Sequence, residues 1–298
     1  ATYNHALFDA VRGATKEITS NTTSAEATET TSLKSFNADG FTLGDKGGVN
    51  NSTGSANNFI SWNWKANGSG SSNSSGDITS TVSANTDAGF SIVSYTGSGT
   101  TGNSVGHGLG VIPDAIFIKS RTTQSWNCWF PNTSMGATKM MQLDNTGATS
   151  TVSWLHDTMP TSSVFYLGAG AATNAQSGYI AYCWKSIDGY SKVGSYVGNN
   201  NADGTFVYTG FRPAFVMTKQ SSTSGDWTLH DSARDIDNPL FNELTANESS
   251  AEGTSDADID FTSNGFKIRR ASGQFNASGA TVIYLAFAEQ PFKYSNAR

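Results

Sequence analysis

Apolar and polar residues alternate with a period of two in short segments throughout the chain. In the segment FISWNWK (residues 59–65), Ile60, Trp62 and Trp64 fall on one face, with polar residues between them. A period of two is typical of a β-strand with one buried and one solvated face. Helical periodicity is weak and limited to residues 5–13 and 230–238. The pattern therefore predicts an all-β protein with turns rich in Gly, Asn and Ser.

The strand-like segments recur in the same order after 100 positions. PDAIFIK begins at Pro113 and PAFVMTK at Pro213, and each repeat closes with an aromatic strand, around Ile180 and around Ile283. We expect these pairs to occupy equivalent places. About six strands in each repeat of this length are typical of an antiparallel β-sandwich. The predicted fold class is therefore all-β, with tandem antiparallel β-sandwich repeats that are jelly-roll-like.

The N-terminal segment matches only the second half of a repeat. LFDAVRG, from Leu7, corresponds to LHDSARD, from Leu229, and FISWNWK corresponds to the closing aromatic strand. We expect the missing half to lie upstream, with completion by another chain as the alternative. The Ser/Gly-rich stretch 66–77 is the predicted linker, and the later two repeats are expected to pack rigidly end to end.

Three units follow from these boundaries. They are a partial first unit with its linker (1–77), a second unit (78–187) and a third unit (188–298).

Composition and charge exclude several classes of partner. Charged residues make up 14% of the 298 residues, and the net charge is −6. Lys and Arg are scattered, so no basic patch is available for nucleic acid. The apolar runs fall far short of the roughly 20 residues that span a bilayer, so no membrane insertion is expected. Cys128 and Cys183 are predicted to be free thiols, although one disulfide stays open.

Neither a catalytic residue nor a cofactor-binding or metal-binding residue is predicted. Four histidines occur without metal-ligand spacing and are assigned to turns or polar surface: His5, His107, His156 and His230. The motif Leu-x-Asp-x-x-Arg occurs at Asp9/Arg12 and Asp231/Arg234. We interpret it as an ion pair that fixes a turn after a strand, with a substrate clamp as the alternative.

Acidic residues alternate at Asp256, Asp258 and Asp260. We interpret them as a solvated strand edge that resists edge-to-edge pairing. Binding of Ca²⁺ is the alternative, because carboxylate oxygens are the ligands that this ion prefers.

The seven tryptophans divide into two groups. Three lie on the closing strands and are assigned to the core: Trp62, Trp64 and Trp184. Four lie near predicted loops and are candidates for stacking on glycan rings: Trp126, Trp129, Trp154 and Trp227. Aromatic rings in loops can stack on the apolar faces of sugars.

Several long strings resemble a known family. GFSIVSYTG, VGHGLGVIPDAIFIKSR, SGYIAYCWKSIDGYSKVGSY, FVYTGFRPAFVMTK and AFAEQPFKYSNAR, in this order, resemble the repeat domain of unknown function in virion, tail-fibre-like proteins of marine tailed phages such as cyanophages. The resemblance covers nearly the whole chain, and its family has no established catalytic residues to carry over.

The resemblance implies a non-enzymatic virion protein, made in the host cytoplasm and part of a tail fibre or similar appendage for host-surface attachment. It implies contacts with other copies of the chain, as a homotrimer, with other virion proteins, and with a host-surface glycan or protein. The sequence itself shows no coiled-coil heptads. A capsid decoration or head-fibre protein, a glycan depolymerase and a cellular adhesin are the alternatives.

Overall fold

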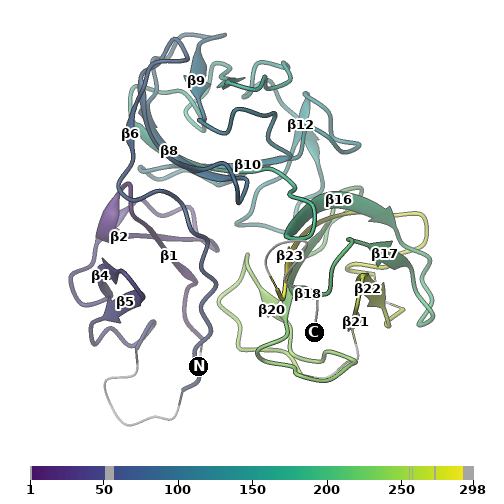
Figure 1. Cartoon of the computed structure of the whole chain (residues 1–298). Helices are drawn as coiled ribbons and strands as arrows, with labels where there is room; N and C mark the ends of the chain where they lie inside the picture. Colours follow the sequence, from purple (N-terminus) through teal and green to yellow (C-terminus); the bar gives the residue numbers. More distant parts are fainter. Residues whose placement is uncertain (1, 51–56, 255, 257, 272, 291–298) are drawn as a thin grey trace.

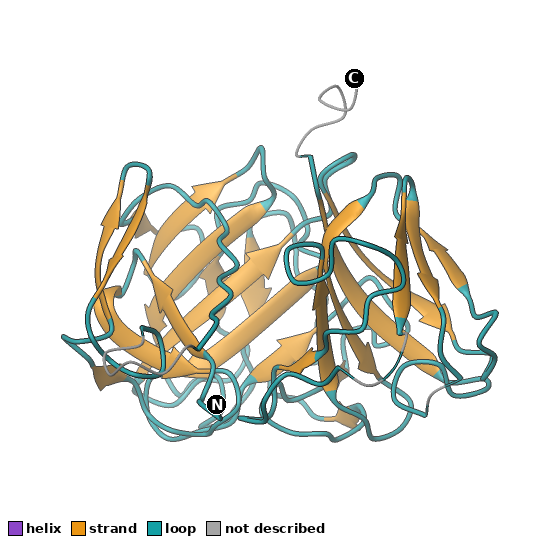
Figure 2. Cartoon of the chain, turned by 90° about the horizontal axis from the view of Figure 1, so that it is seen from below, coloured by secondary structure: helices purple, strands orange, loops and turns teal. Residues whose placement is uncertain are grey.

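The computed structural model describes residues 2–50, 57–254, 256, 258–271 and 273–290. Every regular element in these residues is a β-strand, so the predicted all-β class is confirmed (Figure 2). The weak helical pattern at residues 5–13 gives a strand and a tight turn instead. No helix in this part of the chain is long and apolar enough to cross a membrane.

The first unit forms a small sheet and a hairpin, coloured purple in Figure 1. The sheet has the order β1-β2-β3, and β4 pairs with β5. The bounds are β1 (Ala6–Asp9), β2 (Gly13–Thr19), β3 (Ala27–Thr28), β4 (Leu33–Asn37) and β5 (Gly40–Leu43).

The second unit has a large antiparallel sheet of order β11-β10-β15-β8-β7-β6, a two-stranded sheet β14-β9 and a hairpin β12-β13. The bounds are β6 (Ser71–Asn73), β7 (Ser80–Asn85), β8 (Phe90–Thr96), β9 (Ser104–Gly106), β10 (Ala115–Ser120), β11 (Asn127–Trp129), β12 (Lys139–Met140), β13 (Ser150–Thr151), β14 (Val164–Tyr166) and β15 (Gly178–Trp184).

The third unit has a large sheet of order β16-β23-β18-β19-β20 and a smaller sheet β17-β22-β21. The bounds are β16 (Ser191–Val197), β17 (Phe206–Tyr208), β18 (Pro213–Gln220), β19 (Trp227–Asp231), β20 (Leu244–Thr245), β21 (Ile259–Thr262), β22 (Gly265–Ile268) and β23 (Thr281–Ala288).

The second and third units share one strand arrangement. The order β11-β10-β15-β8 in one corresponds to β19-β18-β23-β16 in the other. Lys119 lies opposite Ile180, and Lys219 lies opposite Ile283. The expected correspondence of these strands and of the two closing isoleucines is therefore confirmed.

The repeated Asn of each closing segment has a structural reason. The side-chain oxygen of Asn174 accepts hydrogen bonds from the backbone amides of Ser98 and Gly99, and its amide donates to two carbonyl oxygens. Asn276 binds the amide of Asn199 and two carbonyl oxygens in the same way. One buried amide side chain thus ties the loop after β8 or β16 to the closing segment.

The central strands of each large sheet are buried on both faces, so the prediction of one solvated face is wrong for them, whereas the edge strands β6 and β16 keep exposed positions. One face of each sheet packs inside its own sandwich, as Ile116 does in the second unit and Val216 in the third. The opposite faces share a cluster that includes Phe117 of β10 and Leu285 of β23. The units therefore pack through the faces of their sheets rather than end to end, because those faces are apolar.

The segment FISWNWK does not form the predicted strand. Residues 57–66 have no ladder partner among the described residues, although the exposed fraction still alternates with a period of two. Trp64 packs edge-on against Trp184 and Phe287, with ring centroids 6.3 and 5.4 Å apart. The core assignment of these tryptophans therefore holds without a sheet.

The predicted linker is partly a strand. Within residues 66–77, β6 forms the edge of the second unit's large sheet. The hydroxyl of Ser83 accepts from the Asn67 amide and donates to the Gly68 carbonyl. A Ser/Gly-rich composition does not prevent pairing where a neighbouring strand supplies these partners.

Candidate functional site

The structure buries three of the four tryptophans that we expected to present to glycans. Trp126, Trp129 and Trp227 are among the largest fully buried side chains, so these rings cannot stack on an external sugar. They lie on or beside β11 and β19, which are short and buried along their whole length. Trp154 is half-buried beside Gly170 and stays a candidate.

Two of the buried indoles join neighbouring units. Trp126 donates from Nε1 to the carbonyl oxygen of Thr19 in the first unit, at 2.8 Å. Trp227 donates in the same way to the carbonyl oxygen of Gln142 in the second unit, at 2.9 Å. The same type of contact therefore connects the first unit to the second and the second to the third.

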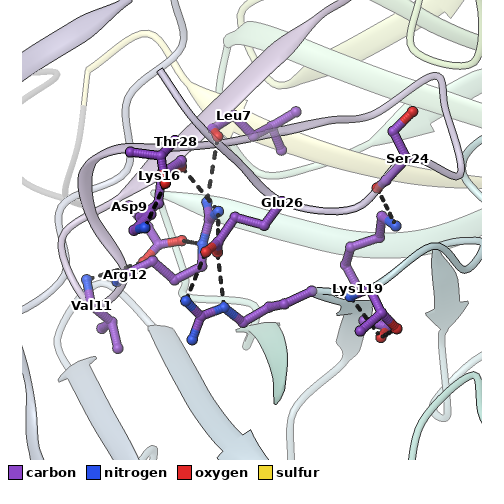
Figure 3. A network of polar contacts seen from close by, with 12 residues as sticks. Leu7, Asp9, Val11, Arg12, Lys16, Ser24, Glu26, Thr28 and Lys119 are labelled. Atoms are coloured by element: carbon purple, nitrogen blue, oxygen red, sulfur yellow. Dashed lines mark hydrogen bonds and ion pairs between the residues drawn. The ribbon is translucent and has the colours of Figure 1, made fainter. Parts of the chain in front are cut away.

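A buried lysine accompanies each of these indoles. Lys119 donates from Nζ to the carbonyl oxygens of Thr23, Ser24 and Gln124 (Figure 3). Lys219 donates to the carbonyl oxygen of Thr146 in the preceding unit and to that of Gln220. Burial lowers the pKa of both lysines to about 8. Both ammonium groups reach across the junction to backbone oxygens.

The two Asp-Arg motifs fix turns, as we interpreted them. In the turn between β1 and β2, Arg12 donates from Nε to Asp9 at 2.5 Å, and its amide bonds to the same carboxylate (Figure 3). Asp231 and Arg234 repeat both contacts after β19, with Nε 2.6 Å from the carboxylate. The Arg12 side chain is fully buried. A substrate clamp is therefore wrong for the first motif.

The first motif is extended by contacts with the second unit. The hydroxyl of Tyr182 donates to Asp9 at 2.7 Å. Glu26 lies between Arg12 and Arg121, with closest contacts of 3.3 and 2.7 Å. Burial alone would raise the pKa of Glu26, but Arg121 and Arg12 lower it overall. This charged network belongs to the junction between the first and second units.

A second polar cluster lies inside the third unit, and sequence reasoning missed it. His230 of β19, Glu243 before β20 and Asp258 before β21 bring metal-ligating atoms within 4.8 Å of one another. His230 Nε2 lies 3.2 Å from Asp258 Oδ2, and both side chains are only 2% exposed. Phe275 packs edge-on against the imidazole. No motif spacing could reveal these residues, because only the fold brings the three segments together.

Glu243 is the most perturbed acid of this cluster. Burial, together with the neighbouring Asp258 carboxylate, raises the pKa of Glu243 to about 8. Its Oε2 is buried and has no hydrogen-bond partner. Two carboxyl groups that lie side by side without a donor between them require a proton or a cation.

The remaining acids of residues 251–260 do not form the predicted row. Asp258 is buried, so a wholly solvated strand edge is wrong. Asp256 pairs with Arg270 at 2.7 Å, and Asp260 pairs with Arg269 at 3.3 Å. Arg270 also contacts Asp258, at 3.1 Å, so arginines pair with all three acids, and no Ca²⁺ site formed by the three together is present.

The other histidines and the cysteines have structural surroundings. His107 is buried in its glycine-rich turn and accepts from the Leu109 amide. His156 is exposed in a turn with a positive φ of 56°. His5 is partly buried, and burial lowers its pKa. Cys128 and Cys183 are free and buried, which confirms the predicted thiols.

One pocket lies at the rim of the third unit. It has a volume of about 240 Å³ and is lined by Phe211, Arg212, Ser263, Glu289 and Gln290. Arg212 and Glu289 form an ion pair across it at 3.1 Å. Pockets that hold small ligands are usually larger, roughly 300–1,000 Å³. The pocket therefore gives little support to a small-molecule site.

Comparison with known proteins places the chain in a family. A domain of unknown function, DUF7483, matches residues 1–291, so the chain belongs to this family. Neither a curated protein nor a solved structure matches the chain.

Proposed function

We propose that this member of the DUF7483 family is a non-enzymatic structural protein of a phage virion, part of a tail fibre or similar appendage for host-surface attachment. The observation that carries the proposal is the repeated junction: Trp126 and Trp227 both donate to a carbonyl oxygen of the preceding unit. Units that contact their neighbours in one repeated way form stiff tandem arrays. Such arrays suit an appendage, and the ordered strings that resemble the virion repeat domain support the same assignment.

The third unit offers an aromatic surface for attachment. Phe206 and Tyr208 alternate on β17, and 46% and 64% of these side chains are exposed. Because residues two apart in a strand point to the same face, the two rings lie on one face of the strand. They take the role of glycan-stacking residues that we first gave to the buried tryptophans.

The second unit does not offer the equivalent surface. Its corresponding strand, β9, carries Ser104 and Gly106, both buried. Asp77 accepts hydrogen bonds from Ser104, and Asn73 lies so close to Gly106 that a Cβ there would come within 2.2 Å of its side-chain oxygen. The third unit is therefore the one that we assign to the host-surface glycan or protein.

The proposed partners are further copies of the chain, arranged as a homotrimer, and other virion proteins. Subnanometre imaging of the intact particle tests the location. Density for the tandem sandwiches in a tail appendage supports the proposal. Density on the capsid surface replaces it with a decoration or head-fibre protein, and density in neither place overturns it.

Incubation of the purified chain with host-surface polysaccharide tests the mode of action. We expect binding without release of reducing ends, weakened by Tyr208→Ser or Phe206→Ser. Trp154→Ser is the matched variant for the remaining loop tryptophan. Sustained release of reducing ends indicates a glycan depolymerase and overturns the non-enzymatic assignment. A lack of binding, with the chain located in the tail, limits the role to a structural stalk.

A further inference from the structure

Three potential ligand atoms meet at one place in the interior of the third unit. His230, Glu243 and Asp258 each direct one nitrogen or oxygen atom to within 4.8 Å of the others. Glu243 Oε2 is buried without a hydrogen-bond partner, and the His230 and Asp258 side chains of the same group are each only 2% exposed. An unsatisfied buried polar atom is costly and rare in native proteins, so a group that would satisfy it is expected.

We propose that His230, Glu243 and Asp258 bind one divalent transition-metal ion of the Zn²⁺ type. One imidazole nitrogen and two carboxylate oxygens form a donor set that Zn²⁺ accepts, with a fourth position left for water. Ca²⁺ and Mg²⁺ prefer sites made of oxygen atoms, so the imidazole disfavours them.

The distances fit this ion. Ligand atoms in a tetrahedral Zn²⁺ site lie roughly 3.3 Å apart when the metal–ligand bonds are about 2.0 Å long. His230 Nε2 and Asp258 Oδ2 are 3.2 Å apart. All three ligand atoms lie within 4.8 Å of one another, so a small movement of the Glu243 side chain would bring its oxygen to the tetrahedral spacing.

The backbone holds the three ligands in place. His230 lies in the interior of β19, opposite Val216 of β18. Glu243 exchanges two backbone hydrogen bonds with Gly253, both 2.9 Å long. The Asp258 amide donates to Leu240 at 3.0 Å, and its carbonyl accepts from Arg269 at 2.9 Å. The site is therefore positioned by strand pairing rather than by mobile side chains alone.

Neighbouring charged residues orient the Asp258 carboxylate without neutralising the negative charge of the site. Arg270 donates to Asp258 Oδ1 at 3.1 Å, which leaves Oδ2 directed at His230. Asp256 offsets the charge of Arg270 at 2.7 Å, and the negative charge of Asp226 also acts on Glu243. Outer partners of this kind fix the orientation of metal-binding carboxylates.

The other units show that the fold does not need this cluster. Trp129 lies opposite Ile116 in the second unit, the register position that His230 occupies in the third. Phe8 stands at the corresponding place in the motif of the first unit. The metal would thus be specific to the third unit, where it would connect β19 to the segments before β20 and β21.

Titration of the metal-free full chain with Zn²⁺ tests the proposal. We expect one Zn²⁺ per chain by calorimetry and mass spectrometry, and a thermal midpoint that rises with Zn²⁺ concentration because the ion binds only the folded state. His230→Phe should weaken binding by more than the roughly 10–100-fold that loss of an outer partner costs. We choose phenylalanine because Phe8 occupies the equivalent position in the first unit, so the variant is expected to fold.

Matched measurements separate this site from other metal binding. His156→Asn changes an exposed histidine and should leave the affinity unchanged. X-ray absorption of the Zn²⁺-loaded parent chain should show one imidazole nitrogen and two carboxylate oxygens around the metal. This measurement uses no variant, so it tests the ligand set even if His230→Phe fails to fold. Absence of stoichiometric binding, equal affinity in His230→Phe, or a ligand set without imidazole overturns the proposal.

Discussion

At one register position, the second unit places an indole where the third unit places an imidazole. Trp129 lies opposite Ile116, is fully buried, and donates to the Gly136 carbonyl at 2.6 Å. His230 lies opposite Val216 and faces two carboxyl groups. The same strand pairing thus surrounds an apolar filling in one unit and a polar cluster in the other. The chemistry of an interior position is independent of the strand order around it.

The residues that the two units share lie on the opposite face of the sheet. Lys119 alternates with the interior residue Ile118 and so shares a face with Phe117, which packs in the cluster between units. Lys219 has the same position on β18. The contact between units uses equivalent residues, whereas the interior of each sandwich differs.

The largest expected effect on stability comes from placing the third unit's histidine at the equivalent position of the second unit. Trp129→His places an imidazole in the second unit without the two carboxyl groups that face His230 in the third unit. It also removes much of a buried indole ring. We expect a loss of about 3–5 kcal/mol in the free energy of unfolding, the range for truncating a buried aromatic residue. Urea unfolding followed by circular dichroism measures it. Trp129→Phe is the control and should cost less, and a loss below about 1 kcal/mol for Trp129→His contradicts the comparison.

The next effect tests what the units share. Lys119→Met and Lys219→Met each remove a buried donor from backbone carbonyl oxygens. We expect each variant to lose about 1–3 kcal/mol, the cost of leaving buried groups unsatisfied. Lys119→Met should lose more, since it has three acceptors rather than two. Equal stability of either variant with the parent in urea unfolding would show that the junction does not depend on the ammonium group.

The third prediction concerns the pH dependence of stability that Glu243 gives to the third unit. The pKa of Glu243 is raised to about 8 in the folded chain, above its unfolded value of 4.5. The folded state therefore binds the proton more strongly, and this stabilisation is present at low pH and lost as pH rises through about 8. We expect an effect on the order of 1 kcal/mol, because the side chain is partly exposed and screened.

Glu243→Gln isolates this contribution. Two other histidines with lowered pKa values, the partly buried His5 and the buried His107, act in the opposite direction below pH 6.5. They are unchanged in the variant, so the difference between the two stability profiles belongs to Glu243. Parallel profiles of parent and variant in metal-free buffer would contradict the raised pKa.

The smallest effect concerns the acceptor at the junction. Gln142→Ala keeps the carbonyl oxygen that binds Trp227 and removes a partly exposed side chain whose Oε1 accepts a hydrogen bond from the Asn145 amide. We expect a change within about 0.5 kcal/mol, as for other surface substitutions. Trp227→Phe, which removes the indole donor and leaves Gln142 intact, is the matched control and should cost more in the same unfolding experiment.

The repeats made much of the fold predictable. Alternation predicted strands, and the spacing between Pro113 and Pro213 predicted their equivalent places. The burial of both sheet faces was not predictable, because it arises when two units meet and no single strand pattern records that contact. Trp126 and Trp129 were misplaced because β11 is buried throughout and has no polar alternation to identify it.

The polar cluster was hidden for a different reason. His230, Glu243 and Asp258 are 13 and 15 positions apart, without any motif between them. One signal did exist: alignment of the repeats puts His230 where Trp129 and Phe8 stand. A polar residue at a position otherwise held by aromatic rings indicates an interior with its own chemistry.

The indoles and lysines at the junctions all donate to carbonyl oxygens of the neighbouring unit. A carbonyl oxygen is present in every residue, so these contacts place no demand on the side chain that carries it. Thr19 serves one junction and Gln142 the other. These two backbone acceptors therefore leave the side chains at positions 19 and 142 free to differ, while the indole donor stays the same at both junctions.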